Sequence, residues 1–354
     1  MSTSRTRAIV RAIVFSATLA LPACTKNAAA APPEGEVRLP GAGAPLKLAL
    51  VTGVQGLGDK SLNDSAYAGM LRAKVKLGAE VQVLQSKSAA DYQPNLTVLA
   101  AQDFDEIFAV GPAMTRDVAT LAKNYPRRHF AIVDSLVDQV NVTSLRFRGQ
   151  DGSFLAGALA AMVSKTKRVA FLGGVDLPSS RTLEAGFAAG AREADPKVTV
   201  ANKYVGSFED AASCKALAGE LFDGGADIVL VAAGKASLGA IDQVRGRSNA
   251  YVIGVDTDQD ALAPGKVLTS VIKRVDVAVF KTALQAQAQK LPAGPVELGL
   301  KDGGVGLSEL RYTRRVVGAA HLARLAALRR AIVEGSIVPP TTREQLAAFK
   351  PIAL

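Results

Sequence analysis

Histidine and the other residues that commonly carry catalysis or bind metals are scarce in this sequence. The chain of 354 residues has two histidines, His129 and His321, two cysteines and no tryptophan. Neither histidine has a cysteine, aspartate or glutamate at the spacing of a metal-ligand motif, which argues against zinc and against histidine-based catalysis. No Gly-x-Ser-x-Gly and no Gly-x-x-x-x-Gly-Lys-Ser/Thr occurs. We therefore expect a protein that is not an enzyme and that uses no cofactor or metal.

The two cysteines differ in their surroundings. Cys24 ends the sequence Leu21-Pro22-Ala23-Cys24, which resembles the bacterial lipobox, where the cysteine becomes the first mature residue and carries a diacylglyceryl group. The alternative is an ordinary signal peptide with a chance cysteine. Cys214 is then left without an intramolecular disulfide partner, so a secreted chain of this kind depends on core burial alone.

The N-terminal segment has the pattern of a secretory signal. Arg5, Arg7 and Arg11 precede an apolar stretch at 12–21, which is shorter than the ~20 apolar residues needed to cross a bilayer. We predict a signal peptide at 1–23 and a lipidated N-terminus with a flexible Ala-, Pro- and Gly-rich linker at 24–45. Acyl chains contribute ~0.8 kcal/mol for each buried CH₂, so a lipid anchor holds the protein on a cell membrane, facing the periplasm or the exterior.

Charge and aromatic content argue against a nucleic-acid partner. The net charge is +10, and removing the three signal-segment arginines leaves +7. These charges are scattered, and only 5% of residues are aromatic, whereas nucleic-acid binding favours a basic stripe with stacking aromatics. A solvated, mildly basic surface that can face anionic lipid headgroups is the favoured interpretation.

Short runs rich in Val, Ile, Leu and Ala alternate with segments of helix length. Alternation of buried strands with helices predicts parallel βαβ units and doubly wound α/β sheets. The predicted strands are 46–52, 80–84, 106–111, 129–134, 168–173, 198–205, 227–233 and 251–255. The predicted helices are 62–77, 93–101, 114–122, 154–164, 182–193, 211–221, 238–244 and 317–334.

The number of strands allows one large sheet or two lobes, and the connecting segments favour two. The polar, glycine-bearing segment 145–152 is a plausible crossing between lobes, and a second crossing is expected after Asp256. We expect an N-terminal lobe of 46–148 plus about 257–290 and a C-terminal lobe of 149–256 plus about 291–354. Residues 296–312, with a turn at 302–304, are expected to form a β-hairpin. Two lobes place the carboxyl ends of both sheets across one cleft, where open α/β sheets bind ligands.

Carboxylates at predicted strand ends are the strongest candidates for ligand contacts. Asp134 ends one strand, and Asp256 and Asp258 follow another. At these positions a carboxylate can accept hydrogen bonds from hydroxyl or amine groups in the cleft, and the alternative is a helix N-cap. The glycine-rich loop 53–59 lacks the spacing of a dinucleotide fingerprint, so we expect it to bring backbone N–H groups close to a ligand.

Ordered motifs along the mature chain resemble one known family. Gly58-Asp59-Lys60-Ser61-Leu62-Asn63-Asp64 resembles the Asp-Asp-Lys-Ser-Phe-Asn signature of the basic membrane protein family, the purine-nucleoside receptor lipoproteins of ABC uptake systems. The resemblance continues in order through 130–135, 147–160, 169–174, 204–210, 232–234, 253–259 and 268–276. It implies the type I periplasmic-binding-protein fold, with two doubly wound parallel-sheet lobes joined by crossover segments.

The resemblance also implies which residues contact the ligand. In this family a purine base lies between two aromatic side chains, while carboxylates and a lysine hold the base and ribose. Carried over by position, Phe208 matches the aromatic residue of the second lobe, and Asp134, Asp256 and Lys273 match the polar contacts. Asn63 and Gly234 lie in matching motifs.

Two positions depart from the family pattern. Gly53 replaces an aspartate after the first strand, and Leu62 replaces the signature phenylalanine. Loss of base stacking (~1–3 kcal/mol) and of a charged hydrogen bond (~1.5–3 kcal/mol) would weaken nucleoside binding by roughly two to four orders of magnitude. Gln55, Tyr92 and Phe104 are candidates for compensating contacts.

The sequence therefore predicts a membrane-anchored, monomeric receptor that captures a small molecule, most plausibly a purine nucleoside or base, for an ABC permease. One alternative is a receptor of the same fold with a changed, non-nucleoside ligand, which Gly53 and Leu62 favour. Another is a surface or signalling lipoprotein without a transport partner, for which the basic C-terminal segment leaves room.

Overall fold

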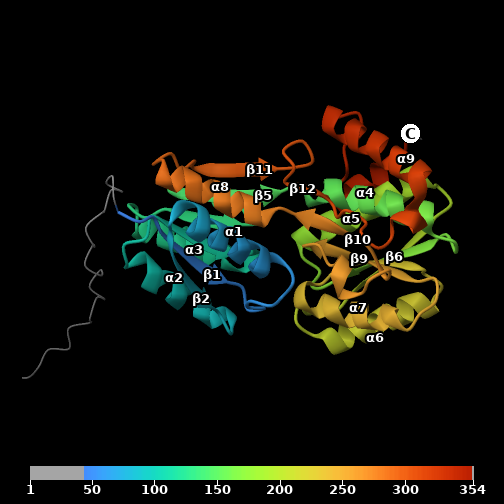
Figure 1. The fold of residues 1–354 in the computed structure, drawn as a ribbon, viewed down its shortest axis with the longest axis horizontal. Coiled ribbons are helices and arrows are strands. Elements are labelled where there is room, and N and C mark those ends of the chain that lie inside the picture. The colour runs from blue at the N-terminus through green and yellow to red at the C-terminus, as the bar shows by residue number, and fades with distance from the viewer. Residues whose placement is uncertain (1–43, 353–354) are drawn as a thin grey trace, which may run out of the picture. The chain divides into compact units, whose positions relative to one another are not determined.

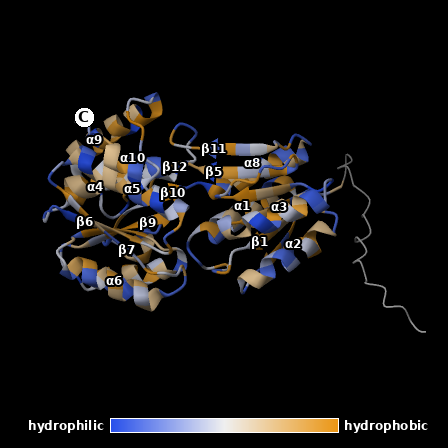
Figure 2. Cartoon of the chain, turned by 180° about the vertical axis from the view of Figure 1, so that it is seen from behind, coloured by the Kyte–Doolittle hydropathy of each residue, from blue (hydrophilic) through white to orange (hydrophobic). Residues whose placement is uncertain are grey.

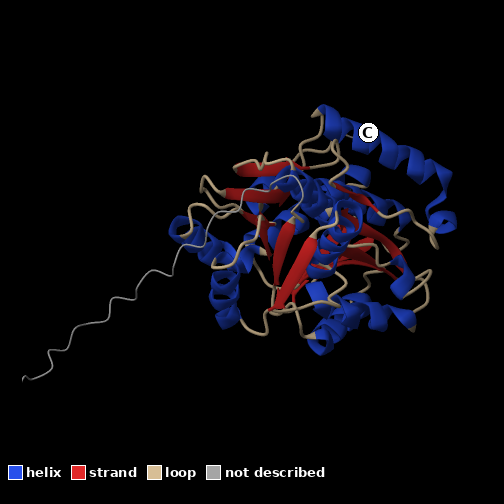
Figure 3. Cartoon of the chain, turned by 60° about the vertical axis from the view of Figure 1, so that its left-hand side comes forward, coloured by secondary structure: helices blue, strands red, loops and turns tan. Residues whose placement is uncertain are grey.

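The computed structural model describes residues 44–352, which lie within the compact unit of residues 35–354. The predicted signal peptide and Cys24 lie outside the described residues. The described part contains two six-stranded sheets, each covered by helices on both faces (Figures 1 and 3). The predicted α/β fold of two largely parallel sheets is confirmed.

The first sheet has the strand order β2-β1-β3-β4-β5-β11, and all its neighbouring strands run parallel. Its strands are β1 (Lys47–Thr52), β2 (Glu80–Gln85), β3 (Glu106–Val110), β4 (Phe130–Val133), β5 (Val142–Phe147) and β11 (Gly294–Leu298). Because side chains alternate along a strand, Leu48 and Leu50 face α1 (Leu62–Leu77) and α8 (Val275–Gln287). Ala49 and Val51 face α2 (Tyr92–Ala100) and α3 (Thr115–Asn124) on the other side.

The second sheet repeats this strand order as β7-β6-β8-β9-β10-β12, with only β12 antiparallel. Its strands are β6 (Arg168–Gly173), β7 (Thr199–Tyr204), β8 (Ile228–Ala232), β9 (Tyr251–Asp256), β10 (Val267–Lys273) and β12 (Val305–Leu307). One face packs on α4 (Gly149–Val163), α5 (Pro178–Ala194) and α9 (Arg314–Glu334). The other packs on α6 (Ala211–Asp223) and α7 (Ser237–Arg245). The apolar strands lie between these helix layers (Figure 2).

Short elements complete the described chain: η1 (Ala89–Asp91), η2 (Pro112–Met114), η3 (Gly234–Ala236), η4 (Asp260–Leu262) and α10 (Arg343–Ala348). The eight predicted strands are all present, and each end lies within one residue of its expected position. Helix α4 begins five residues before its predicted start, because the polar residues 149–152 form its first turn and not an extended crossing.

The connections between the sheets correct several expectations. The first crossing lies at Arg148, between β5 and α4, within the segment expected to cross. The second lies at Arg274 and not after Asp256, because β10 continues the second sheet beside β9. Residues 267–273 therefore belong with the C-terminal lobe, although 257–290 was expected in the N-terminal one. Residues 294–298 form β11 of the first sheet, although the C-terminal lobe was expected from about 291 onward.

The expected hairpin within 296–312 is also wrong. Its two strands belong to different sheets: β11 pairs with β5 and β12 pairs with β10. The segment 299–304 with its turn is thus a third crossing. Local turn chemistry predicted a bend here, but the pairing is decided by distant strands.

Close packing of α4 on α5 fixes the start of α5. A Cβ atom at Gly157 would lie 1.9 Å from the carbonyl oxygen of Phe187, and one at Gly190 would lie 1.8 Å from that of Phe154. Only glycine allows this approach of the two backbones. Pro178, with its fixed φ, occupies the first turn of α5 beside the carboxyl end of β6.

One buried carboxyl group in the first sheet has no compensating contact. Glu106 begins β3 and is fully buried, and both of its carboxyl oxygens lack a hydrogen-bond partner among residues 44–352. Burial, together with the nearby charge of Asp105, raises the pKa of Glu106 well above its ordinary value. The native state therefore holds this group neutral at a pH at which the unfolded chain ionises it.

We predict that Glu106→Gln stabilises the protein increasingly as the pH rises. Below the ordinary pKa of a glutamate both states are protonated and the penalty is absent; above it only the unfolded state ionises, so wild-type stability falls. A buried unpaired polar group costs about 1–3 kcal/mol, and each kcal/mol corresponds to about 2–4 °C in Tm. Thermal unfolding at pH 4 and pH 8 should show the variant's advantage only at the higher pH.

The matched control is Glu80→Gln. Glu80 begins β2, on the other side of β1, and is exposed. Its replacement should leave the pH dependence of Tm unchanged. An advantage of Glu106→Gln that is equal at both pH values would contradict a penalty that arises from ionisation.

Candidate functional site

A cavity of about 630 Å³ lies between the carboxyl ends of the two sheets. Its walls are formed by residues at or just beyond the ends of β1, β3, β4, β8, β9 and β10. Open α/β sheets bind ligands at this edge, where the strand order reverses. All eight residues predicted to contact the ligand line the cavity: Gly53, Leu62, Asn63, Asp134, Phe208, Gly234, Asp256 and Lys273.

A buried lysine between two carboxylates forms the polar centre of the cavity. Lys273 Nζ lies 2.8 Å from Asp134 Oδ2 and 3.5 Å from Asp256 Oδ1. Burial disfavours its charge, but the two carboxylates outweigh burial and raise the pKa of Lys273 above its ordinary value. Because Asp134 follows β4 and the other two residues end β9 and β10, the pair Lys273–Asp134 joins the two lobes.

The two aspartates occupy equivalent places at the ends of their strands. Both have left-handed backbones, with φ of 62° at Asp134 and 74° at Asp256, which is uncommon for a residue other than glycine. Neither is the N-cap of a described helix, so the N-cap alternative is wrong for both. Asp258 does not line the cavity; its carboxylate accepts the backbone N–H of Asp260 at 2.9 Å.

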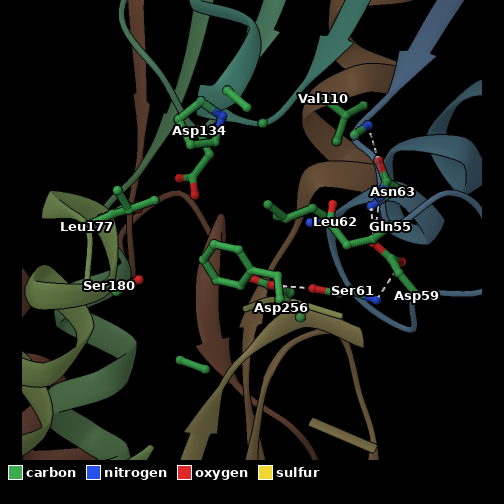
Figure 4. Close-up of a pocket in the computed structure, with 18 of the residues that line it drawn as sticks. Gln55, Asp59, Ser61, Leu62, Asn63, Val110, Asp134, Leu177, Ser180 and Asp256 are labelled. Atoms are coloured by element: carbon green, nitrogen blue, oxygen red, sulfur yellow. Dashed lines mark hydrogen bonds between the residues drawn. The ribbon is translucent and has the colours of Figure 1, made fainter. Parts of the chain in front are cut away.

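The loop before α1 holds Asn63 in place. The Asn63 side chain accepts the backbone N–H of Gly53 at 2.9 Å and donates to Asp59 Oδ2 at 2.8 Å. Asp59 also accepts backbone N–H groups of Ser61, Asn63 and Asp64. Burial nevertheless raises the pKa of Asp59, since it outweighs these hydrogen bonds. Asn63 is fixed by contacts on both sides of its amide and can present one further N–H to the cavity (Figure 4).

The two departures from the family pattern meet in one region of the cavity. A Cβ atom at Gly53 would lie 2.9 Å from Gln55 Oε1, so the amide of Gln55 fills the space that a side chain at 53 would take. Leu62 projects into the cavity from the start of α1 (Figure 4). Phe208 comes from the other lobe, where its ring packs against Gly174; a Cβ atom there would lie 2.3 Å from the ring.

Hydrogen bonds on the Lys60–Ser61 loop also join the two lobes. Ser61 Oγ donates to Asp256 Oδ2 (Figure 4). Thr257 Oγ1 and Gln259 Nε2 both donate to the carbonyl oxygen of Lys60, at 2.6 and 3.1 Å. The residues around the aspartate of one lobe are thus bonded directly to the first-helix loop of the other.

Sequence reasoning missed several residues of the cavity. Ser61 lies inside the matched signature, but its bond to Asp256 joins positions 195 residues apart. Ser179, Ser180 and Leu183 begin α5, and the strand-end argument, applied to β6, would have found them. Among the compensating candidates, Gln55 and Tyr92 line the cavity. Phe104 does not, and packs in the core beneath α2 and α3.

Other classes of site were sought in residues 44–352. No three His, Cys, Asp or Glu side chains in this range cluster as metal ligands would. In the same range, no helix combines the length and the apolar character that a bilayer crossing requires.

Comparisons with known proteins agree with the motifs. Residues 47–337 match the family described as "Bmp: ABC transporter substrate-binding protein PnrA-like". The "ABC transporter nucleoside-binding protein BmpA" of Lactococcus lactis is 33% identical over 318 residues, which cover 84% of this chain and 89% of that protein. An uncharacterized lipoprotein of Pyrococcus furiosus is 32% identical over 288 residues, 77% of this chain and 72% of that one.

A solved structure supports the same assignment. The solute-binding protein of an ABC transporter system from Aeropyrum pernix superposes with a TM-score of 0.78 at 25% identity, over 86% of this chain and 96% of that chain. The predicted type I periplasmic-binding-protein-like fold is thereby confirmed, and so is the resemblance to basic membrane proteins. The chain belongs to the Bmp family of PnrA-like ABC transporter substrate-binding proteins.

Proposed function

We propose that this protein captures a purine nucleoside or a related base in the cavity between its lobes and delivers it to an ABC permease. The observation that carries the proposal is the placement of Asp134, Asp256 and Lys273 on the same cavity as Phe208. Carboxylates held at strand ends accept hydrogen bonds from sugar hydroxyls, while an aromatic ring stacks on a base. The name of the Lactococcus lactis relative gives the same ligand class for that protein.

The geometry assigns a role to each side of the cavity. Asp256 Oδ1 is buried and has no hydrogen-bond partner among the described residues, apart from its ion pair with Lys273 at 3.5 Å, so it can accept a ligand hydroxyl. Asn63 and Gln55 offer amide groups to a base edge, and Phe208 offers a ring face. No nucleophile with an adjacent base lines the cavity, so these groups bind and orient a ligand without reacting with it.

We also propose that Cys24 carries the lipid that attaches the protein to a cell membrane, with the two lobes outside the cytoplasm. The lipobox-like Leu21-Pro22-Ala23-Cys24 supports this, as does the description of the Pyrococcus furiosus relative as a lipoprotein. The anchored receptor acts as a monomer beside its permease.

A second candidate is a receptor whose ligand is not a nucleoside. Gly53 and Leu62 favour it, because the cavity has no carboxylate at 53 and no aromatic ring at 62. Gln55, which fills the space beside Gly53, presents a neutral amide with both donors and acceptors. Free bases, pentoses or other small polar metabolites would then be better ligands.

We predict that Phe208→Ala weakens nucleoside binding about 5- to 100-fold, because one base–aromatic stack is lost. Isothermal titration of the mature protein with adenosine, guanosine and inosine measures this. Phe280→Ala is the matched control, since Phe280 on α8 is partly buried and lies outside the cavity. Equal affinities of wild type and Phe208→Ala would remove the ring from the site.

The two candidates differ in what restoration of the family residues should do. If Gly53 and Leu62 have changed the ligand, the double variant Gly53→Asp/Leu62→Phe should gain about 100-fold or more in nucleoside affinity. The Gln55 side chain can move to admit a residue at 53, since its contact with the new Cβ is a side-chain end. Leu71→Phe, at an exposed leucine of α1, is the control. An unchanged dissociation constant counts against a changed ligand.

We predict that Cys24→Ser moves the protein from the membrane fraction to the soluble fraction, whereas Cys214→Ser leaves it in the membrane fraction. Cys214 is buried between α6 and its sheet, and burial raises the pKa of its thiol to about 12, so it is not available for acylation. Cell fractionation with immunoblotting, or metabolic labelling with a fatty-acid analogue, measures the outcome. Retention of Cys24→Ser on the membrane would refute the lipid anchor.

A further inference from the structure

The first turn of α5 presents unused hydrogen-bond donors to the cavity. The backbone N–H groups of Ser179 and Ser180 have no acceptor among residues 44–352, and no side chain caps this end of the 17-residue helix. The next N–H, that of Arg181, is already bonded to the carbonyl oxygen of Leu177 at 2.9 Å. Free N–H groups at a helix start carry partial positive charge and favour an acceptor or an anion.

The side chain of Ser180 is a second, independent sign of a missing partner. Ser180 is 4% exposed, yet its hydroxyl has no hydrogen-bond partner within the described part of the chain. The residue lines the cavity, and its oxygen points into it (Figure 4). Buried polar groups in proteins are nearly always hydrogen-bonded, so this hydroxyl is placed for a ligand atom.

A second cavity of about 680 Å³ adjoins the first at this point. The residues common to both are Asp134, Pro178, Ser179, Leu183 and Lys273. Four arginines line the second cavity: Arg146, Arg148, Arg181 and Arg343. Three of them are paired with Asp151, Asp176 and Glu184, which lie outside both linings. Arg146 is exposed and has no partner in the described residues.

The balance of charge differs between the two cavities. The first is lined by three carboxylates, Asp59, Asp134 and Asp256, against the single cation Lys273. In the second, Lys273 and the four arginines face Asp134, Glu297 and Glu344, an excess of cations. Lys273 stands at the junction and offsets the charge of Asp134 there. An anion is therefore favoured beyond Lys273, toward the first turn of α5, and disfavoured in the body of the first cavity.

We propose that the first turn of α5, with Arg146, forms a subsite for an oxyanion, a phosphate or a carboxylate, carried on the sugar of a bound nucleoside. The inference rests on the proposed function. If the 2′ and 3′ hydroxyls donate to Asp134 and Asp256, the 5′ substituent is the part of the sugar left to reach Ser179 and Ser180. The free N–H groups, the Ser180 hydroxyl and the Arg146 guanidinium then supply charge-assisted hydrogen bonds.

Isothermal titration of the complete mature protein tests the subsite. The ligands are adenosine, inosine and guanosine, each nucleoside's 5′-monophosphate, and adenosine with a 5′-carboxylate in place of its hydroxymethyl group. We expect at least one anionic derivative to bind about tenfold or more tighter than its parent nucleoside, as hydrogen bonds to a charged group imply. Comparison of phosphate with carboxylate identifies which oxyanion the subsite prefers.

Two variants locate the effect. Ser180→Ala and Arg146→Gln should each weaken binding of the anionic ligand about tenfold and change the affinity for the parent nucleoside less than about twofold. The matched controls are Ser213→Ala and Arg192→Gln. Ser213 lies in the first turn of α6 and Arg192 is exposed on α5, and both lie outside the two cavities, so neither change should affect any ligand.

The outcomes separate this inference from the proposed function. If nucleosides bind and none of the anionic derivatives binds more tightly, the subsite is overturned and the nucleoside receptor stands. If no nucleoside, base or nucleotide binds, the proposed function falls and the subsite with it. If the anions bind more tightly but Ser180→Ala and Arg146→Gln behave like their controls, the oxyanion lies elsewhere and this assignment is wrong.

Discussion

The ion pair of Lys273 with Asp134 and Asp256 is the interaction on which the rest of the site depends. A buried ammonium group is strongly disfavoured unless opposite charges compensate it, and here the compensating carboxylates come from both lobes. Removal of either carboxylate would leave a buried charge with half its compensation. The arrangement therefore fixes the polar centre of the cavity and also favours the relative position of the lobes in which all three groups meet.

This convergence follows from the repetition of one strand order. Each sheet brings its strands to the cleft by their carboxyl ends, and each contributes an aspartate one step beyond or at the end of a central strand, with a left-handed backbone. The crossings at Arg148, Arg274 and 299–304 keep the two edges facing each other. Binding groups from distant parts of the sequence thus share a cavity because the topology places equivalent strand ends opposite one another.

Much of this could be predicted from the sequence, because buried parallel strands are continuous apolar runs and carboxylates that follow them fall at the cleft. The failures share a physical cause. β10 lies beside β9 with a register shift, and β11 and β12 are short edge strands whose partners lie in separate sheets. Their assignment depends on pairing with distant residues, which a local pattern does not contain. Ser61 and Ser180 were missed for the same reason, since their roles arise only where the lobes meet.

The two ends of the cavity are constrained to different degrees, and this bears on how its ligand can vary. At the polar end, any change among Lys273, Asp134 and Asp256 unbalances buried charge, so a hydroxyl-bearing group is strongly specified there. At the end formed by Gly53, Gln55 and Leu62, the groups are neutral, and the Gln55 side chain already occupies the space beside Gly53. Substitution at this end exchanges stacking area and amide contacts without uncovering a charge. A receptor of this design can therefore change the base it accepts while it retains the sugar-binding end, and Leu62 lies where such a change has the lowest energetic cost.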